Sequence, residues 1–191
     1  MEKTLEQHPS NIIKIVLFGP ESTGKTTLSR ELAKHYKTNW VPEFARNYLQ
    51  DKWKTQKLIC ELKDIVPIAI GQIQLENKLA LTANKVLICD TDLLETKVYS
   101  QQYYNGVVPK ELEKAISQNA YDLYFLTYID TPWEADDLRD KPEEREEMFN
   151  AFEEALITHN KPYLLLKGDK ETRLQTAIHT IDKLLTTKSL K

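Results

Sequence analysis

The stretch that most constrains this chain is Gly19–Thr26, which reads Gly-Pro-Glu-Ser-Thr-Gly-Lys-Thr. An apolar run, Ile12–Phe18, precedes it. Gly19 and Gly24 allow the backbone to curl so that successive N–H groups face a phosphate, and a helix beginning at Gly24 adds its positive dipole end. Apolar residues recur at helical spacing after the stretch, at Leu28, Leu32 and Tyr36. The pattern predicts a P-loop, or Walker A motif; the alternative is an ordinary Gly-rich turn.

The side chains of this predicted P-loop have separate expected roles. Lys25 is expected to reach the β- and γ-phosphates of a bound nucleotide and to act in catalysis, and the Thr26 hydroxyl to bind Mg²⁺. ATP and Mg²⁺ are therefore the predicted cofactors. The predicted nucleotide-binding residues of the loop are Gly19, Glu21, Ser22, Thr23, Gly24, Lys25, Thr26 and Thr27.

Length and composition restrict the classes of protein. The 191 residues suit one α/β domain with a substantial core, and 41% hydrophobic with 29% charged residues is typical of a globular protein. The net charge of −3 gives no general attraction to nucleic acid, so we expect no nucleic-acid partner. The four histidines and two cysteines show no metal-ligand spacing, so we expect no zinc site. No oligomeric state is predicted.

The start of the chain and its cysteines indicate a location. Residues 1–11 lack apolar periodicity, so we expect a flexible tail before one P-loop domain over residues 12–187. No targeting pattern opens the chain, and no segment approaches 18 uninterrupted apolar residues. Cys60 and Cys89 fit a reduced setting better than a disulfide framework. We therefore expect a cytoplasmic protein that does not contact a membrane.

Apolar runs alternate with helical patterns along the whole chain. Strands are expected at residues 12–18, 39–42, 86–89, 123–129 and 163–166. Strands separated by helices predict a five-stranded parallel sheet with helices on both faces. After the second strand we expect a helix over Phe44–Gln50 and a polar loop over Asp51–Lys57. The predicted class is α/β, a P-loop NTPase of the nucleoside and nucleotide kinase type with a lid.

Two carboxylates follow predicted strands and are candidate catalytic residues. Asp90 follows the apolar run at 86–89 as a Walker B carboxylate does, and is expected to hold Mg²⁺; a turn former is the alternative. Glu43 lies beyond the second strand, where it can act as general base or orient an acceptor hydroxyl. Arg46, three residues later, can keep Glu43 ionised or contact a phosphate. A solvated Glu–Arg pair is the alternative.

Other candidates for the substrate site are less specific. Asp92 can bind ribose hydroxyls, or cap the following helix. Trp40 is assigned to the substrate site because an aromatic ring can stack on a flat cationic ring. Other aromatic residues near strand ends can do the same or simply pack, namely Tyr99, Tyr103, Tyr104 and Trp133.

The polar stretch at 134–147 is a candidate lid. Its Arg139 and Arg145 can close over a nucleotide and stabilise the transferring phosphoryl group, and Arg139 is assigned both a catalytic and a nucleotide-binding role. For Arg145 a solvated helical charge run is an equal alternative. Gly168 and Asp169, which follow the last strand, are assigned to the base-binding loop.

Together these motifs resemble the NadR-type ribosylnicotinamide kinase domain, a P-loop AAA-like ATPase and kinase family. The resemblance covers Ile12–Leu185 and rests on the segments Gly19–Leu28, Pro42–Arg46, Asp90–Asp92, Thr131–Trp133 and Asp136–Arg139. It implies that ATP phosphorylates the 5′-hydroxyl of a small-molecule nucleoside, nicotinamide riboside, giving nicotinamide mononucleotide for NAD synthesis. Better-known members are fused to a nucleotidyltransferase, and some to a helix-turn-helix. This chain is expected to be a freestanding kinase.

One departure from the family pattern leaves other functions open. The fused enzymes carry an aromatic residue immediately before the Glu of Glu-x-x-Arg, whereas Pro42 stands there in this chain. The acceptor can therefore be another nucleoside or small metabolite. Some relatives are known only as ATPases, so a regulatory nucleotide-binding ATPase is a third possibility. A GTPase switch is disfavoured because no Asn-Lys-x-Asp motif follows the strand expected at 123–129.

Overall fold

The computed structural model describes residues 4–134 and 142–189. Five parallel strands form one sheet in the order β2-β3-β1-β4-β5, which confirms the predicted fold. The strands are β1 (Ile13–Phe18), β2 (Trp40–Val41), β3 (Val86–Asp90), β4 (Leu123–Thr127) and β5 (Tyr163–Leu166). The central strand β1 pairs with both β3 and β4, so the loop after β1 lies at the middle of the sheet.

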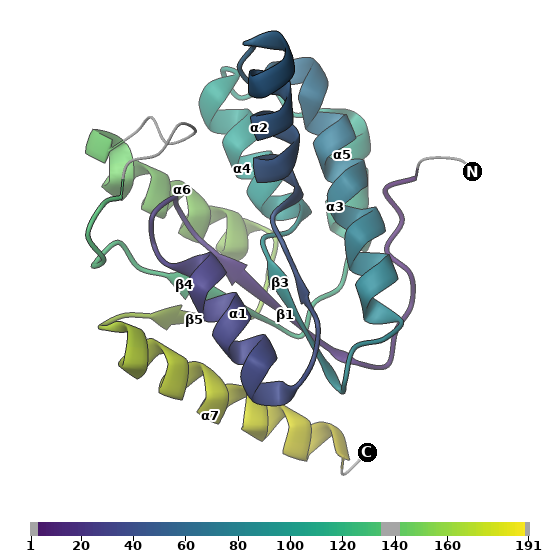
Figure 1. Ribbon diagram of the computed structural model, residues 1–191, viewed down its shortest axis with the longest axis vertical. Helices are drawn as coiled ribbons and strands as arrows, with labels where there is room; N and C mark the ends of the chain where they lie inside the picture. The colour runs from purple at the N-terminus through teal and green to yellow at the C-terminus, as the bar shows by residue number, and fades with distance from the viewer. Residues whose placement is uncertain (1–3, 135–141, 190–191) are drawn as a thin grey trace.

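Helices cover both faces of the sheet. Figure 1 shows α1 and α7 together on one side and α3, α4 and α5 on the other. The helices are α1 (Lys25–Tyr36), α2 (Phe44–Gln56), α3 (Ile65–Ala80), α4 (Leu93–Tyr103), α5 (Lys110–Gln118), α6 (Arg145–Thr158) and α7 (Lys170–Ser189), with 3-10 turns at Leu62–Asp64 and Pro142–Glu144.

The core explains the unbroken apolar run of β1. Val16 and Phe18 belong to the apolar cluster shared with α3, α4, α5 and α6, whereas Ile15 and Leu17 belong to the cluster under α1 and α7. A strand with helices on both faces needs apolar side chains at successive positions rather than at alternate ones. Every residue of β1 is buried, including Lys14, whose ammonium pairs with Glu76 at 2.8 Å.

The second strand is short and lies at the sheet edge. Proline cannot donate a ladder hydrogen bond, so Pro42 is compatible with this position, and the strand ends at Val41. Glu43 then occupies the N-cap position of α2, and its side chain makes no capping hydrogen bond. Val41 pairs with Cys89, so Glu43 and Asp90 lie at the carboxyl ends of neighbouring parallel strands, at the same edge of the sheet.

The region predicted as a polar loop after Gln50 is helical instead, because α2 continues to Gln56. Lys52 lies in this extension and is buried, and its ammonium contacts Asp64 at 2.5 Å and Glu61 at 2.8 Å. These ion pairs join α2 to the segment before α3. The polar composition of residues 51–57 predicted a loop, because the sequence does not show that Lys52 is buried in ion pairs with Asp64 and Glu61.

The predicted flexible tail is in contact with the domain over its described part. Gln7 Nε2 donates to Glu76 Oε1 at 2.8 Å, and the main-chain N–H of His8 donates to Asn77 Oδ1 at 2.8 Å. Both cysteines carry free thiols. Among the described residues, no helix has the length and apolar character needed to span a bilayer.

Candidate functional site

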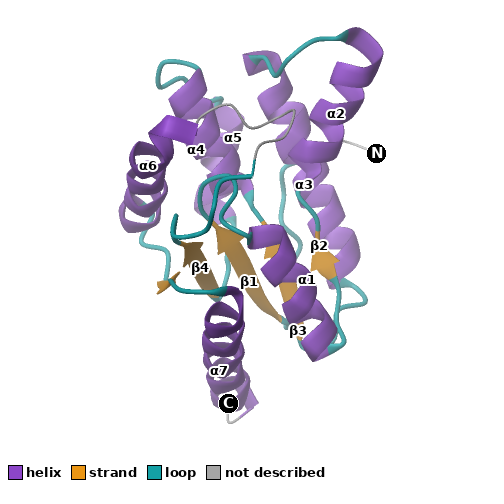
Figure 2. Cartoon of the chain, turned by 60° about the vertical axis from the view of Figure 1, so that its left-hand side comes forward, coloured by secondary structure: helices purple, strands orange, loops and turns teal. Residues whose placement is uncertain are grey.

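The carboxyl ends of the strands meet at one edge of the sheet, where the loops after β1, β3 and β4 lie together (Figure 2). A pocket of about 850 Å³ opens there. Its polar part is lined by the P-loop with Thr131, Pro132, Glu134, Lys170 and Arg173. Its other part, under α2, α3 and α4, is lined by Glu43, Arg46, Leu49, Trp53, Leu58, Ile59, Ile65, Glu95, Thr96, Tyr99, Tyr103 and Tyr104.

The P-loop has the backbone that its glycines predicted. Gly24 caps α1 with φ of +83°, and Gly19 has φ of +140°. A Cβ atom at Gly19 would lie 2.7 Å from the Oγ1 of Thr127 and 2.9 Å from its carbonyl oxygen. Glycine is therefore needed at position 19 both for the dihedral angle and for the close approach to β4.

Lys25 is the first residue of α1 and is buried. Its ammonium donates to the carbonyl oxygens of Gly19 at 2.6 Å and Pro20 at 2.9 Å. The same nitrogen lies 3.5 Å from Glu95 Oε1. The lysine is thus folded back onto its own loop at the floor of the pocket.

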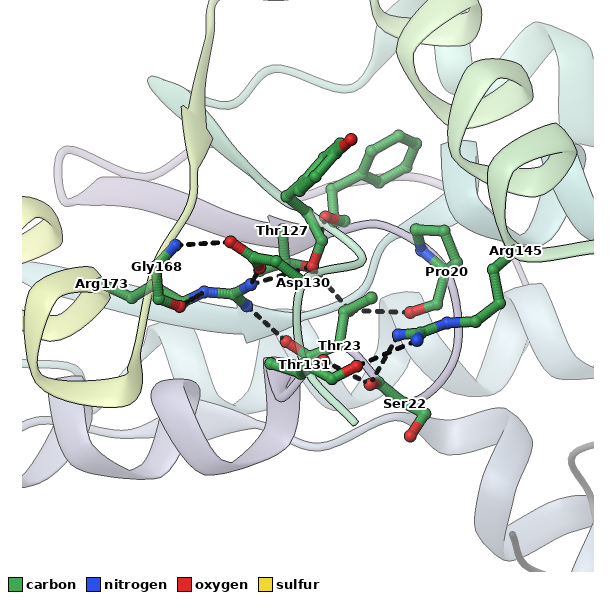
Figure 3. A network of polar contacts seen from close by, with 11 residues as sticks. Pro20, Ser22, Thr23, Thr127, Asp130, Thr131, Arg145, Gly168 and Arg173 are labelled. Carbon is green, nitrogen blue, oxygen red and sulfur yellow. Dashed lines mark hydrogen bonds and ion pairs between the residues drawn. The ribbon is translucent and has the colours of Figure 1, made fainter. Parts of the chain in front are cut away.

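An arginine from the last helix holds the P-loop to the sheet (Figure 3). Arg173 donates from Nη1 to the carbonyl oxygen of Thr23 at 2.7 Å and from Nε to that of Gly168 at 2.9 Å. Its Nη2 donates to the carbonyl oxygen of Tyr128 and pairs with Asp130. One buried guanidinium therefore joins the loops after β1, β4 and β5.

A second arginine holds the loop from the other side. Arg145 donates to the carbonyl oxygens of Thr131 at 2.9 Å and Ser22 at 3.4 Å (Figure 3). Its guanidinium also lies over the ring of Trp133, 5.7 Å from the centroid. Partial burial lowers the pKa of Arg145. The structure thus places Arg145 against the P-loop rather than in a solvated charge run.

Asp90 is the last residue of β3 and is buried, and it does not itself line the pocket. Both carboxylate oxygens are buried without a hydrogen-bond partner among the described residues. Burial and the nearby carboxylate of Glu43 raise the pKa of Asp90 to about 6, and Thr26 and Lys25 partly oppose this effect. Asp90 and Glu43 therefore lie on the same side of the molecule and near the P-loop lysine.

Glu43 and Arg46 both line the pocket from the start of α2. Arg46 Nε lies 3.9 Å from Glu43 Oε2, and each side chain is about one third exposed. An exposed pair at this distance contributes little to stability. Glu43 is accordingly accessible to a bound molecule.

Several assigned residues lie elsewhere. Trp40 does not line the pocket; it packs with the α1 and α7 cluster, and the Arg30 guanidinium lies 5.0 Å from its ring centroid. Asp92 is buried and caps α4, accepting from the N–H of Glu95 at 3.1 Å and from the Tyr124 hydroxyl at 2.6 Å. The structure thus supports the capping alternative for Asp92 and packing for Trp40.

The remaining assignments concern the loop after β5 and the lid. Gly168 donates its N–H to Asp130, and Asp169 caps α7 by accepting from the N–H of Thr172 at 2.8 Å. Neither residue lines the pocket, whereas Lys170 does. Arg139 lies outside the described residues.

Sequence reasoning missed two buried charged residues at the site, Glu95 and Arg173. A signal existed for the arginine, because a cation in the first turn of a helix opposes the helix dipole and indicates a specific partner. Arg173 is such a cation at the start of α7. Glu95 gave no comparable signal, since a glutamate is favourable in the first turn of α4.

Comparisons with known proteins identify relatives over almost the whole chain. The sequence profile of the AAA domain matches residues 14–173. The trifunctional NAD biosynthesis/regulator protein NadR of Salmonella typhimurium, and that of Escherichia coli, are each 27% identical over 183 residues. The matched region is 94% of this chain but only 44% of each relative. The chain thus spans less than half the length of these curated relatives.

Solved structures share the fold at lower identity. A NadR protein in complex with NR has a TM-score of 0.76 at 22% identity, covering 91% of this chain and 51% of that chain. Deoxyadenosine kinase from M. mycoides has a TM-score of 0.65 at 18% identity, and the match covers 90% of this chain and 100% of the kinase. Thymidylate kinase from Ehrlichia chaffeensis has a TM-score of 0.60 at 16% identity, and the match covers 91% of this chain and 99% of that kinase.

These likenesses establish the P-loop fold of nucleoside and nucleotide kinases. The profile match extends from within β1 to Arg173 in α7, and so includes the P-loop and every strand of the sheet. On this match, which covers most of its length, the chain belongs to the AAA domain family.

Proposed function

We propose that this chain is an ATP-dependent phosphotransferase that phosphorylates the 5′-hydroxyl of nicotinamide riboside to give nicotinamide mononucleotide. The carrying observation is that Lys25 and Glu43 line one pocket and that Asp90 is buried close to both of them. Phosphoryl transfer needs charge neutralisation and positioning, which a P-loop lysine and a carboxylate facing the acceptor can supply. The likeness to a NadR protein solved with NR, and to another solved with NAD and AMP-PNP, supports this choice of ligands.

The residues of the site have separate roles in this proposal. The P-loop N–H groups and Lys25 bind the phosphate tail, since the start of α1 points at it. Glu43 accepts a hydrogen bond from the acceptor hydroxyl and orients it toward the terminal phosphorus. Arg173 and Arg145 hold the main chain of the loop that binds the phosphates, through the carbonyl oxygens of Thr23 and Ser22.

The residues fit a magnesium ion bound jointly by protein and nucleotide. Asp90 has two buried oxygens without partners, and Thr26 lies close enough to influence its pKa. Among residues 4–134 and 142–189, no group of three or more His, Cys, Asp or Glu can hold a metal. Mg²⁺ is commonly bound by one or two carboxylates together with substrate phosphates. When bound, it would neutralise charge on the phosphates, with Thr26 and Asp90 holding it directly or through water.

The other end of the pocket suits a flat, positively charged ring. Tyr99, Tyr103 and Trp53 present aromatic surface, and the partly exposed carboxylate of Glu43 lines the same pocket. A cation over an aromatic face gains about 0.5–2 kcal/mol. The pyridinium of nicotinamide riboside has both properties.

A second candidate keeps the reaction and changes the acceptor. Pro42 stands immediately before Glu43, and Trp40 packs with the α1 and α7 cluster instead of lining the pocket. A different nucleoside can therefore occupy the apolar end, which is lined by α2, α3, α4 and residues 58–60.

The test is to incubate the purified chain with Mg·ATP and, in parallel, nicotinamide riboside, adenosine, cytidine, thymidine or no acceptor. Products are identified by mass spectrometry. Nicotinamide mononucleotide as the preferred product supports the first candidate, and another nucleoside monophosphate supports the second. ATP binding without any phosphorylated acceptor would favour a regulatory ATPase.

A further inference from the structure

Glu95 is a buried carboxylate at the pocket that the proposed reaction does not yet use. It lies in the first turn of α4, and its side chain is only 4% exposed. Oε1 faces the Lys25 ammonium at 3.5 Å, whereas Oε2 is buried without a hydrogen-bond partner among the described residues. A charge buried in this way requires compensation. In this structure its compensating cation is Lys25.

The Lys25 ammonium cannot keep all of these contacts when a nucleotide binds. A lysine ammonium has three donors, and the carbonyl oxygens of Gly19 and Pro20 and the carboxylate of Glu95 surround it. A terminal phosphate must displace at least one of these partners. Glu95 is the partner that competes with the phosphate as an anion. Binding of the phosphate therefore leaves Glu95 buried without its cation.

Among the described residues, Lys25 is the cation that forms an ion pair with Glu95. Burial raises the pKa of Glu95, Lys25 opposes the rise, and the carboxylates of Glu43, Asp90 and Asp92 add to it. Once Lys25 turns to a phosphate, the carboxylate needs a hydrogen-bond donor or a proton. The pocket opens directly above it, beside Thr96 and Tyr99.

An acceptor hydroxyl is a donor in the right place. The acceptor oxygen must approach the terminal phosphorus to about 3–3.5 Å before transfer. That phosphoryl group is bound by the Lys25 ammonium, and Glu95 Oε1 lies 3.5 Å from the same nitrogen. A hydroxyl on the acceptor is therefore within reach of Glu95.

We propose that Glu95 has two successive partners: the Lys25 ammonium in the empty pocket, and a hydroxyl group of the acceptor nucleoside once the nucleotide phosphates hold Lys25. Glu95 accepts a hydrogen bond in the second state and takes no proton. The contact with the acceptor nucleoside, which we call the acceptor half, rests on the proposed function. The exchange of Lys25 between Glu95 and the phosphates, the Lys25 half, depends only on nucleotide binding. Glu95 thereby couples the two sites, because it becomes available to the acceptor hydroxyl only when the phosphates hold Lys25.

The experiment compares wild type with Glu95→Gln. Calorimetry measures the affinity for Mg²⁺ with a non-hydrolysable ATP analogue, and initial rates give KM and kcat for nicotinamide riboside. Removing the competing charge should tighten analogue binding about tenfold. Losing the charged hydrogen-bond acceptor of Glu95 should raise KM for the riboside about tenfold. Glu113→Gln is the matched control, because it removes a carboxylate paired with Lys97 at 3.0 Å outside the pocket, and both values should stay at wild type.

Unchanged analogue affinity in Glu95→Gln overturns the exchange with Lys25. An unchanged KM, with or without a lower kcat, overturns the contact with the acceptor. If Glu95→Gln shows no cooperative melting transition, Glu95→Met, which needs no hydrogen bond, takes its place. If wild type forms no nicotinamide mononucleotide, the proposed function and the acceptor half fail together, while the analogue titration still decides the Lys25 half.

Discussion

The guanidinium of Arg173 donates to the carbonyl oxygen of Thr23 at 2.7 Å, across 150 positions of the sequence. The nucleotide-binding loop is thus held from the last helix as well as from its own strand and helix. The same side chain pairs with Asp130 after β4, so three loops are fixed relative to one another. This contact makes the conformation of the loop sensitive to a residue far from any ligand.

Replacing Arg173 by Ala should lower stability and weaken nucleotide binding together. The change leaves the carbonyl oxygens of Thr23, Gly168 and Tyr128 without their donor, and a loss of about 2–3 kcal/mol in the free energy of unfolding is expected. Arg173→Lys keeps the charge but cannot span the three loops, so it should rescue little. Urea unfolding and analogue titration measure both effects. Normal nucleotide affinity in a destabilised Arg173→Ala would show that Arg173 does not position the loop.

Replacing Asp90 by Asn should stabilise the ligand-free protein and abolish activity. The pKa of Asp90 is raised from 3.8 to about 6, so its ionisation destabilises the folded state. This destabilisation grows as the pH rises from 4 to 6 and reaches its full size above pH 6. Asn carries no such cost, and a gain of about 3 kcal/mol is expected at pH 8. The gain should shrink toward zero near pH 4. Thermal melting across this range measures it, and a pH-independent difference between the two proteins would contradict the account.

Glu43→Gln should lower kcat for the acceptor reaction about 10²–10⁴-fold while leaving analogue affinity within a few-fold of wild type. The reason is that Glu43 lines the acceptor side of the pocket and is partly exposed. Initial-rate kinetics with nicotinamide riboside provides the measurement. A normal kcat would remove Glu43 from the reaction.

Gly71→Ala should disturb the site from within α3. A Cβ atom there would lie 2.1 Å from Cε1 of Phe44, the first residue of α2, which follows Glu43. Moving the ring should cost about 2 kcal/mol and shift Glu43. A double variant that adds Phe44→Leu to Gly71→Ala replaces the ring by a smaller side chain, and it should recover part of the lost stability. Denaturant unfolding of the single and double variants tests this, and equal stability of all three proteins would contradict it.

The sequence predicts best what depends on backbone pattern and worst what depends on pairing of charges. The apolar run of β1 and the spacing of Gly19 and Gly24 specify the sheet centre and the P-loop, because both reflect local geometry. Lys52, by contrast, lies in a helix predicted as a loop, since its partners Asp64 and Glu61 come from a later segment. Long-range contacts of this kind leave no local pattern in the sequence.

The same distinction applies to the aromatic residues. Trp40 lies in β2 and Tyr99 in the helix that follows β3, and of these two candidates Tyr99 lines the pocket whereas Trp40 does not. The direction of Trp40 follows from its alternate position in β2, where Val41 faces the opposite cluster. A two-residue strand is too short for its alternation to be read from the sequence.

The most direct test of the central claim is to measure ADP and nicotinamide mononucleotide together during turnover of the wild-type chain with Mg·ATP. The account predicts one ADP formed for each nicotinamide mononucleotide, with ADP formation depending on nicotinamide riboside. ADP released at the same rate with and without the riboside, and no nicotinamide mononucleotide, would contradict it.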